Sequence, residues 1–201
     1  MSTEQERSFI ACIRCDDTTM KFFEQMISNS ASQGNLLTTS HRYSETTRKM
    51  VRAQRARDVD TRTRSDEMVV YFRCYDDYYN IQVRSEAYFG NYWSKNSTGV
   101  LGAFPAAGSQ TTSFNLLNTD GNIITLDDLK TNDATVSLKA RNAGTIKRQL
   151  MQNPKLYGYG DKTGDAVTFN LRILERNVDY PSSTAPYALY IEPRPQLDDD
   201  D

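Results

Sequence analysis

From residue 68 onward the sequence is a succession of short apolar and aromatic segments separated by turn residues. The first two segments, Met68–Tyr75 and Tyr78–Arg84, flank Asp76-Asp77, which suits a two-residue hairpin turn. Asp120-Gly121 gives a later connection the same turn chemistry, and Tyr157–Gly160 is also expected to be a turn. Further strands are expected over residues 112–117, 123–126, 135–140, 145–150, 167–174 and 187–191. Strands of this length and spacing suit an antiparallel sandwich, a jelly roll or a barrel.

The first 66 residues have a different character. Ser8–Ile13 is a short apolar run that predicts a strand, and Asp16 or Asp17 can cap a helix that follows it. Apolar residues recur at helical spacing after that cap, at Met20, Phe23, Met26 and Ile27. This helix should stop in Ser28–Gly34, which is rich in Ser, Asn and Gly. A second helix is expected over Ser44–Asp58, which contains neither Gly nor Pro.

The predicted fold class is therefore α+β and mainly β. Its body is an antiparallel β sandwich or jelly roll, preceded by an N-terminal strand–helix–helix arm. Residues 1–66 are expected to form the N-terminal strand, helix and arginine-rich arm, residues 67–192 the β-rich body, and residues 193–201 an acidic extended tail.

Charge is concentrated in two places. Residues 42–64 hold eight basic and three acidic residues, a net charge of +5 in a chain whose net charge is −2. The basic residues expected to bind a partner are Arg48, Lys49, Arg52, Arg55, Arg57, Arg62 and Arg64. Candidates of opposite sign are the four consecutive aspartates Asp198, Asp199, Asp200 and Asp201. Three interpretations of the basic segment stay open: a solvated helix face, a contact to nucleic-acid phosphates, or a docking arm for a neighbouring copy.

Cysteine and histidine limit the chemistry that the sequence predicts. Cys12 and Cys15 have the CxxC spacing of a thioredoxin-like redox pair, but Ile13 and Arg14 between them fit that turn poorly. With only Cys74 and His41 besides, the chain does not supply a four-ligand zinc set. We expect reduced, buried thiols and neither a metal nor a cofactor.

No apolar run approaches the roughly 20 residues of a membrane-spanning helix. The first fifteen residues, MSTEQERSFIACIRC, also lack the apolar core of a signal peptide. The expectation from these two observations is a cytoplasmic, non-secreted chain that does not enter a membrane.

One segment suggests an enzyme. Ser44–Arg48 has the form Ser-Glu-x-x-Arg and resembles the active helix of the ribosome-inactivating proteins, the rRNA N-glycosidases. Tyrosines in DDYYNIQVR look similar to that family's tyrosine hairpin, and the NYW at residues 91–93 to its later tryptophan. The resemblance implies that Glu45 stabilises an oxocarbenium-like sugar and that Arg48 lies near the leaving base. It also implies that Tyr79 and Trp93 complete the site.

The region from residue 71 to residue 93 is dense in aromatic side chains. Alternation along its first strand puts Tyr71, Arg73 and Tyr75 on one face. Phe72 and Cys74 then lie on the other face. This pattern indicates either a β core with one amphipathic face or a tyrosine surface for assembly, base stacking or sugar binding.

These features favour a non-enzymatic, self-assembling structural protein, such as a viral coat or occlusion-lattice subunit held together by charged arms. A homo-oligomer or lattice is the expected state, and nucleic acid is a possible partner through residues 42–64. The alternatives are an rRNA N-glycosidase-like enzyme and a β-fold module that binds nucleic acid or glycan.

Overall fold

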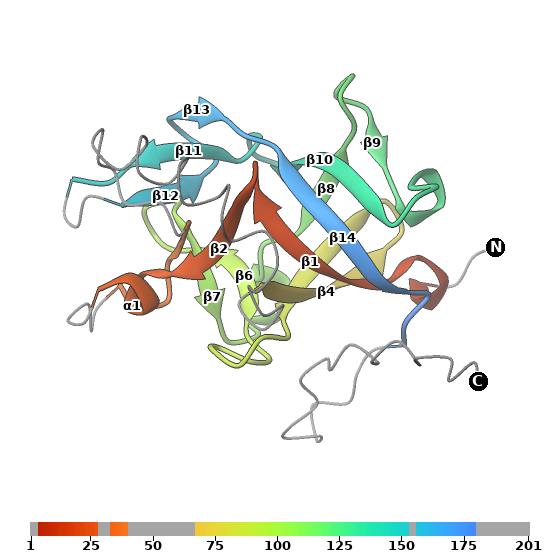
Figure 1. Cartoon of the computed structure of the whole chain (residues 1–201), viewed down its shortest axis with the longest axis horizontal. Coiled ribbons are helices and arrows are strands. Elements are labelled where there is room, and N and C mark those ends of the chain that lie inside the picture. Colours follow the sequence, from red (N-terminus) through yellow and green to blue (C-terminus); the bar gives the residue numbers. More distant parts are fainter. Residues whose placement is uncertain (1–3, 28–32, 40–66, 153–155, 180–201) are drawn as a thin grey trace, which may run out of the picture.

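Apolar and polar residues alternate along several strands of this chain, so such a strand can bury one face and expose the other. The computed structural model describes residues 4–27, 33–39, 67–152 and 156–179. Six of its strands close into an antiparallel barrel (Figure 1). They are β1 (Phe9–Cys15), β4 (Met68–Tyr75), β5 (Tyr78–Val83), β8 (Phe114–Leu117), β10 (Asp133–Ala140) and β14 (Phe169–Arg176). Each pairs with the next in this order, and β14 returns to pair with β1.

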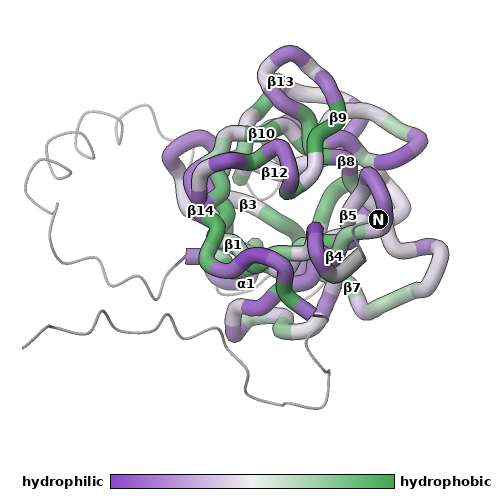
Figure 2. The backbone as a smooth tube through the Cα atoms, turned by 90° about the vertical axis from the view of Figure 1, so that its right-hand side faces the viewer, coloured by the Kyte–Doolittle hydropathy of each residue, from purple (hydrophilic) through white to green (hydrophobic). Residues whose placement is uncertain are grey.

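The inward side chains of these strands fill the barrel. They include Phe9, Phe72, Tyr79, Phe114 and Phe169, each buried with no exposed surface. Phe9 stacks on Phe72 with ring centroids 4.4 Å apart, and Tyr79 meets both rings edge-on. Figure 2 shows hydrophilic residues concentrated in the turns and connections, as expected when the apolar residues line the interior.

Three hairpins extend from the barrel. In the chain, one lies between β1 and β4, one between β5 and β8, and one between β10 and β14. The first joins β2 (Thr18–Phe22) to β3 (Leu37–Thr39), the second β6 (Tyr92–Lys95) to β7 (Leu101–Phe104), and the third β11 (Lys147–Leu150) to β12 (Tyr157–Gly160). A two-residue strand, β13 (Asp165–Ala166), adds to β11. The hairpins contact one another and gather at one end of the barrel (Figure 1). A six-stranded barrel with three such hairpins has the strand order of a β-trefoil.

Two glycines let the hairpins approach one another. A Cβ atom on Gly102 would lie 2.7 Å from the carbonyl oxygen of Asn35, beside β3. One on Gly160 would lie 2.6 Å from the carbonyl oxygen of Gly99, beside β7. Because backbone atoms cannot yield as a flexible side chain can, these positions require glycine for the hairpins to meet.

The remaining elements of the described ranges are short. They are the single helical turns η1 (Glu4–Arg7), α1 (Phe23–Met26), η3 (Gly108–Gln110) and η4 (Leu126–Asp128), and the two-residue strand β9 (Ile123–Ile124). None of these helical turns is long enough to cross a bilayer.

The mainly β, antiparallel prediction is confirmed, and its clearest element is the β4–β5 hairpin. Its strands have the expected bounds to within one residue, and Asp76 takes the positive φ of 63° that such a turn requires. The expected faces of β4 are also confirmed, since Phe72 and Cys74 join the core while Arg73 and Tyr75 do not.

Several predictions need correction. The strands form no sandwich or jelly roll, because β14 pairs with β1 and closes the sheet. The segment β1 pairs on both sides with barrel strands, so it is no part of an appended arm. Instead of capping a helix, Asp16 turns the chain with φ 50° into β2, and among the described residues 16–27 only Phe23–Met26 is helical. Tyr157–Gly160 is the strand β12 rather than a turn.

The predicted helix over residues 44–58 and the strand over 187–191 lie outside the described residues. The predicted domain boundaries at residues 66 and 192 stay predictions. Even so, β1 on one side of the first boundary pairs with β4 on the other.

Candidate functional site

Outward side chains of three adjacent barrel strands stand in two rows. In the first row Cys12 of β1 lies opposite Arg172 of β14, which lies opposite Asp133 of β10. In the second row Arg14, Asn170 and Thr135 occupy the next outward positions of the same strands. Period-two alternation and the barrel register therefore bring charged and polar groups from three distant parts of the sequence together.

Glu67, just before β4, joins the two arginines of this group. One of its carboxylate oxygens accepts a hydrogen bond from Nη2 of Arg14, and the other accepts one from Nη2 of Arg172 at 2.5 Å. The side chain of Glu67 is only 9% exposed, against 47% for Arg14 and 32% for Arg172. Arg172 Nη2 also lies 3.3 Å from Sγ of Cys12. The carboxylate therefore fixes both guanidinium groups while leaving much of their surface to solvent.

The environment of Glu67 favours its ionised form. Burial acts to raise its pKa, but the hydrogen bond from Arg172 and the charge of Arg14 outweigh burial and lower the pKa. At neutral pH the Glu67 carboxylate is therefore a negative charge between two positive ones.

On the other side of this cluster of polar residues, hydrogen bonds hold the side-chain amide of Asn170. Thr135 Oγ1 donates a 2.8 Å hydrogen bond to Oδ1 of Asn170, whose Nδ2 donates to the carbonyl oxygen of Asp16 at 2.6 Å. Asp17 follows in the β1–β2 turn and is exposed, as are Asp133 and Thr135. Both hydrogen bonds fix the orientation of the amide across the strands.

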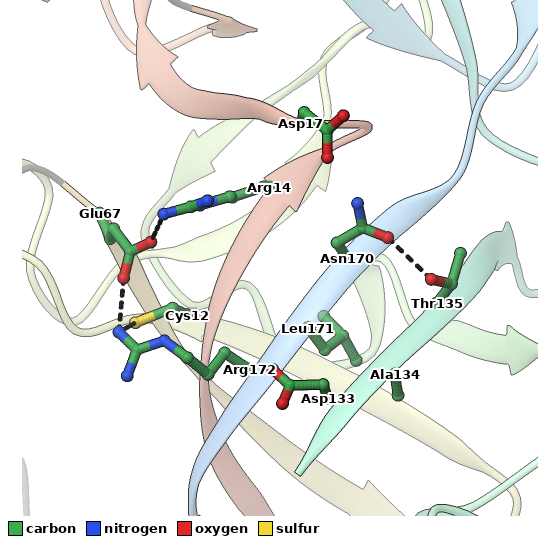
Figure 3. A pocket seen from close by; sticks show the side chains of 10 residues that line it. All are labelled: Cys12, Arg14, Asp17, Glu67, Asp133, Ala134, Thr135, Asn170, Leu171 and Arg172. Carbon is green, nitrogen blue, oxygen red and sulfur yellow. Dashed lines mark hydrogen bonds and ion pairs between the residues drawn. The ribbon is translucent and has the colours of Figure 1, made fainter. Parts of the chain in front are cut away.

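These residues line a cavity of about 380 Å³ on the outside of the barrel (Figure 3). We call it the mixed-charge face, made of Cys12, Arg14, Asp17, Glu67, Asp133, Thr135, Asn170 and Arg172. Figure 3 shows Glu67 and the two arginines on one side of the cavity and the Asn170–Thr135 pair on the other. It offers guanidinium donors and carboxylate acceptors together, so it suits a polar partner that itself carries both signs of charge.

No protein-family model matches this sequence, and no curated protein sequence matches it.

Within the described ranges, no three His, Cys, Asp or Glu side chains gather closely enough to hold a metal ion. Cys12, Cys15 and Cys74 are all buried, and no disulfide joins any two of them, as expected for reduced thiols. Burial raises the pKa of the Cys15 thiol to about 11, so at neutral pH it is protonated and a poor nucleophile.

Two residues of the N-glycosidase resemblance lie in the barrel core. Tyr79 has no exposed surface, and its hydroxyl accepts a 2.9 Å hydrogen bond from the backbone N–H of Leu126. Burial raises its pKa. Trp93 is also fully buried and meets Phe169 edge-on at 6.4 Å. Neither ring presents a face to solvent on which a base could stack.

The other predicted site residues lie outside the described residues. They are Glu45, Arg48, Lys49, Arg52, Arg55, Arg57, Arg62, Arg64 and Asp198 to Asp201. The roles assigned to them stay predictions, and so does the enzyme interpretation, which an rRNA depurination assay tests directly.

Sequence reasoning missed the mixed-charge face. The sequence suggested no binding role for either residue. Arg14 was noted as a poor fit to a redox motif, and residue 67 as the start of the β-rich body. A signal was present in the sequence. Cys12 and Arg14 are separated by one apolar residue, and so are Asn170 and Arg172, which is the period-two pattern of a strand with one polar face. That signal gives the outward positions but does not show that the three strands are neighbours.

Proposed function

We propose that this protein is a non-enzymatic structural protein that assembles with copies of itself through charged surfaces. The observation that carries the proposal is the composition of the mixed-charge face. Exposed Asp17 and Asp133 lie beside the half-exposed Arg14 and Arg172 within one cavity.

A two-fold interface brings the same patch of two subunits together, so the patch must complement itself. A patch of one sign repels its copy, whereas a patch with both signs can pair with it. On the mixed-charge face, the arginines of one copy can meet the aspartates of the next. Glu67 supports this by holding the two guanidinium groups in place before association, which reduces the side-chain entropy lost on binding.

The charged segments of the sequence support the same proposal. The basic segment 42–64 comes shortly before Glu67 in the sequence, and Glu67 lines the mixed-charge face. Contacts made by this segment would add to a small interface at the face, toward the area of roughly 1,200 Å² that stable association needs. The viral coat or occlusion-lattice role stays part of this proposal by analogy alone, drawn from the β-rich body and the charged segments of the sequence.

Light scattering over a range of protein and salt concentrations tests the proposal. We expect wild-type oligomers that dissociate as salt screens the charges. The double variant Asp17→Lys/Asp133→Lys should stay monomeric, because it leaves the face without exposed aspartates, and its remaining carboxylate, Glu67, is already paired with Arg14 and Arg172. A matched control is Asp120→Lys/Asp165→Lys, which makes the same charge change at two exposed positions elsewhere.

Circular dichroism should show the same β spectrum for all three proteins. A wild-type protein that stays monomeric at every concentration and salt tried overturns the proposal. Oligomers of unchanged size in the Asp17→Lys/Asp133→Lys variant overturn the role of this face.

A further inference from the structure

A second group of outward residues covers another part of the barrel. Along β4, β5, β8 and the end of β10, one row runs through Arg73, Asn80, Ser113 and Arg141. Ser113 Oγ donates to Asn80 Oδ1 at 2.7 Å, and the backbone N–H of Arg141 donates to the carbonyl of Ser113 at 2.8 Å. The next row runs through Tyr75, Tyr78, Asn115 and Lys139. We call these eight residues the arginine–tyrosine face.

Cation–π contacts hold the arginines of this face. The rings of Tyr75 and Tyr78 stack with centroids 5.7 Å apart and planes at 16°. The guanidinium carbon of Arg73 lies 5.0 Å from the centroid of Tyr75, and that of Arg141 lies 3.8 Å from the centroid of Tyr78. An arginine held on a ring keeps its full charge and loses less side-chain entropy when it binds an anion.

The charge of the arginine–tyrosine face is of one sign. Arg73, Lys139 and Arg141 are basic, and none of its eight residues is acidic. Asp76 and Asp77 lie at its edge in the β4–β5 turn, where Asp77 accepts a hydrogen bond from Asn115 through its backbone carbonyl. The face therefore suits a partner with several carboxylates or phosphates.

The described part of the chain stops beside this face. Tyr71 lies two residues before Arg73 on the outer side of β4, and its hydroxyl donates a 3.1 Å hydrogen bond to the carbonyl of Val178. The backbone N–H of Val178 donates to the carbonyl of Ser8, which fixes the segment further. The next residue, Asp179, contributes to the raised pKa of Tyr71, after the larger effect of burial. Asp179, after which the described part of the chain ends, therefore lies near the strand that carries Arg73 and Tyr75.

The length of chain beyond this point is sufficient to cross the face. An extended chain covers about 3.3 Å per residue, so residues 179 to 198 can span up to roughly 60 Å. Four strands spaced about 4.8 Å apart are roughly 15 Å across. The acidic run Asp198–Asp201 can thus reach every cation of the face on its own barrel.

We propose that Asp198–Asp201 docks on the arginine–tyrosine face of the same chain. The opposite charges and the exit of the chain beside Tyr71 both favour this occupant. Single-stranded nucleic acid is less suited, because each tyrosine ring has one face on the other ring and one under an arginine, leaving none for a base. Attachment to the same barrel also raises the effective concentration of the acidic run at this face.

Two-dimensional ¹H–¹⁵N NMR of the full chain tests the docking. Replacing all four aspartates Asp198 to Asp201 by asparagine should shift the amide signals of residues 73–80, 113–115 and 139–141. In an Arg73→Gln/Arg141→Gln background, the same four replacements should leave those signals unchanged. A matched control replaces the exposed Asp120 and Asp165 by asparagine and should not shift the signals of the face.

A synthetic peptide of residues 190–201, added to the chain with the four asparagines, gives the strength of the contact. Each exposed carboxylate–arginine pair should contribute roughly two- to five-fold in affinity. Binding should weaken in 0.5 M salt because the charges are then screened within about 4 Å. The Arg73→Gln/Arg141→Gln replacements should reduce the affinity by the contribution of two pairs.

Each other outcome overturns the proposal. Shifts confined to residues 42–64 place the acidic run on the basic segment instead. Shifts of the face that vanish on dilution show that the run comes from a second copy. Binding of a dT12 oligonucleotide to the face of wild type and of the four-asparagine chain with equal affinity shows that the acidic run does not occupy it.

Discussion

The mixed-charge face and the arginine–tyrosine face lie on the same barrel and both depend on arginine, yet they hold it differently. On the first, Arg14 and Arg172 share the largely buried carboxylate of Glu67. On the second, Arg73 and Arg141 rest on the rings of Tyr75 and Tyr78. An ion pair cancels part of the charge that it fixes, whereas an aromatic ring fixes the cation and leaves its charge intact.

This difference separates two kinds of surface. The mixed-charge face presents charges of both signs and can match a copy of itself. The arginine–tyrosine face presents one sign and needs an acidic partner. The difference also predicts different costs of substitution. Removing the Glu67 carboxylate leaves two arginines without their shared counter-charge, whereas replacing Arg141 removes a cation–π contact with Tyr78.

The largest effect is expected for Glu67→Gln. It leaves Arg14 and Arg172 without their shared carboxylate, and hydrogen bonds to charged groups are worth about 2 kcal/mol. Chemical denaturation should show a loss of about 2 kcal/mol in the free energy of unfolding. As a control, Glu175→Gln, at an exposed position of β14, should change it by less than about 0.5 kcal/mol. Equal losses in the two variants contradict the structural role of Glu67.

The effect of Glu67→Gln should also depend on pH. Because the folded-state pKa of Glu67 lies below its unfolded value of about 4.3, the stabilisation is complete above that value. It is lost as pH falls through the lower, folded-state pKa. Unfolding measured at pH 7 and at pH 2.5 should therefore show a smaller difference between wild type and variant at pH 2.5. A difference that stays constant over this range shows that the charge of Glu67 is not what stabilises the fold.

An intermediate effect is expected for Arg172→Gln. It removes the hydrogen bond to Glu67 but leaves that of Arg14, so the free energy of unfolding should fall by about 1.5 kcal/mol. The double variant Glu67→Gln/Arg172→Gln should lose less than the sum of the single losses, because the two residues share one interaction. Strict additivity argues against their coupling.

The smallest effect is expected for Arg141→Gln. An exposed cation–π contact is worth about 0.5–1 kcal/mol, and its loss leaves no buried group unpaired. Arg141→Lys should retain part of that contribution. If Arg141→Gln destabilises the protein as much as Arg172→Gln does in the same denaturation series, the two faces do not differ as described.

Sequence reasoning succeeded where structure is local. The β4–β5 hairpin follows from two apolar and aromatic runs on either side of Asp76-Asp77, with alternation clearest next to the turn, so its bounds, turn and inward face were predictable. It failed for β12, because Tyr157–Gly160 carries two glycines that local propensity assigns to a turn. Gly160 is required there by the backbone of a distant hairpin, which no local pattern shows.

The candidate site could not be predicted for a related reason. Glu67, Arg14 and Arg172 meet only because β1 pairs with β14 and β4 follows on the other side of β1. The sequence shows that each is polar within or beside an apolar strand, but it does not show which strands are neighbours. Prediction of the site therefore required prediction of barrel closure.

Barrel closure also affects how the chain folds during synthesis. Phe9, near the start of the chain, pairs with Arg176, so β1 has no partner on that side until nearly all of the described chain has left the ribosome. Until then, β1 and β10 expose edge strands that can pair with other chains. Pairings between such distant residues are slow to form, because the chain loses the entropy of loop closure before the contacts contribute any stabilising free energy. A ribosome-bound chain truncated before β14 should therefore depend on chaperones, while release of β14 should allow folding to proceed.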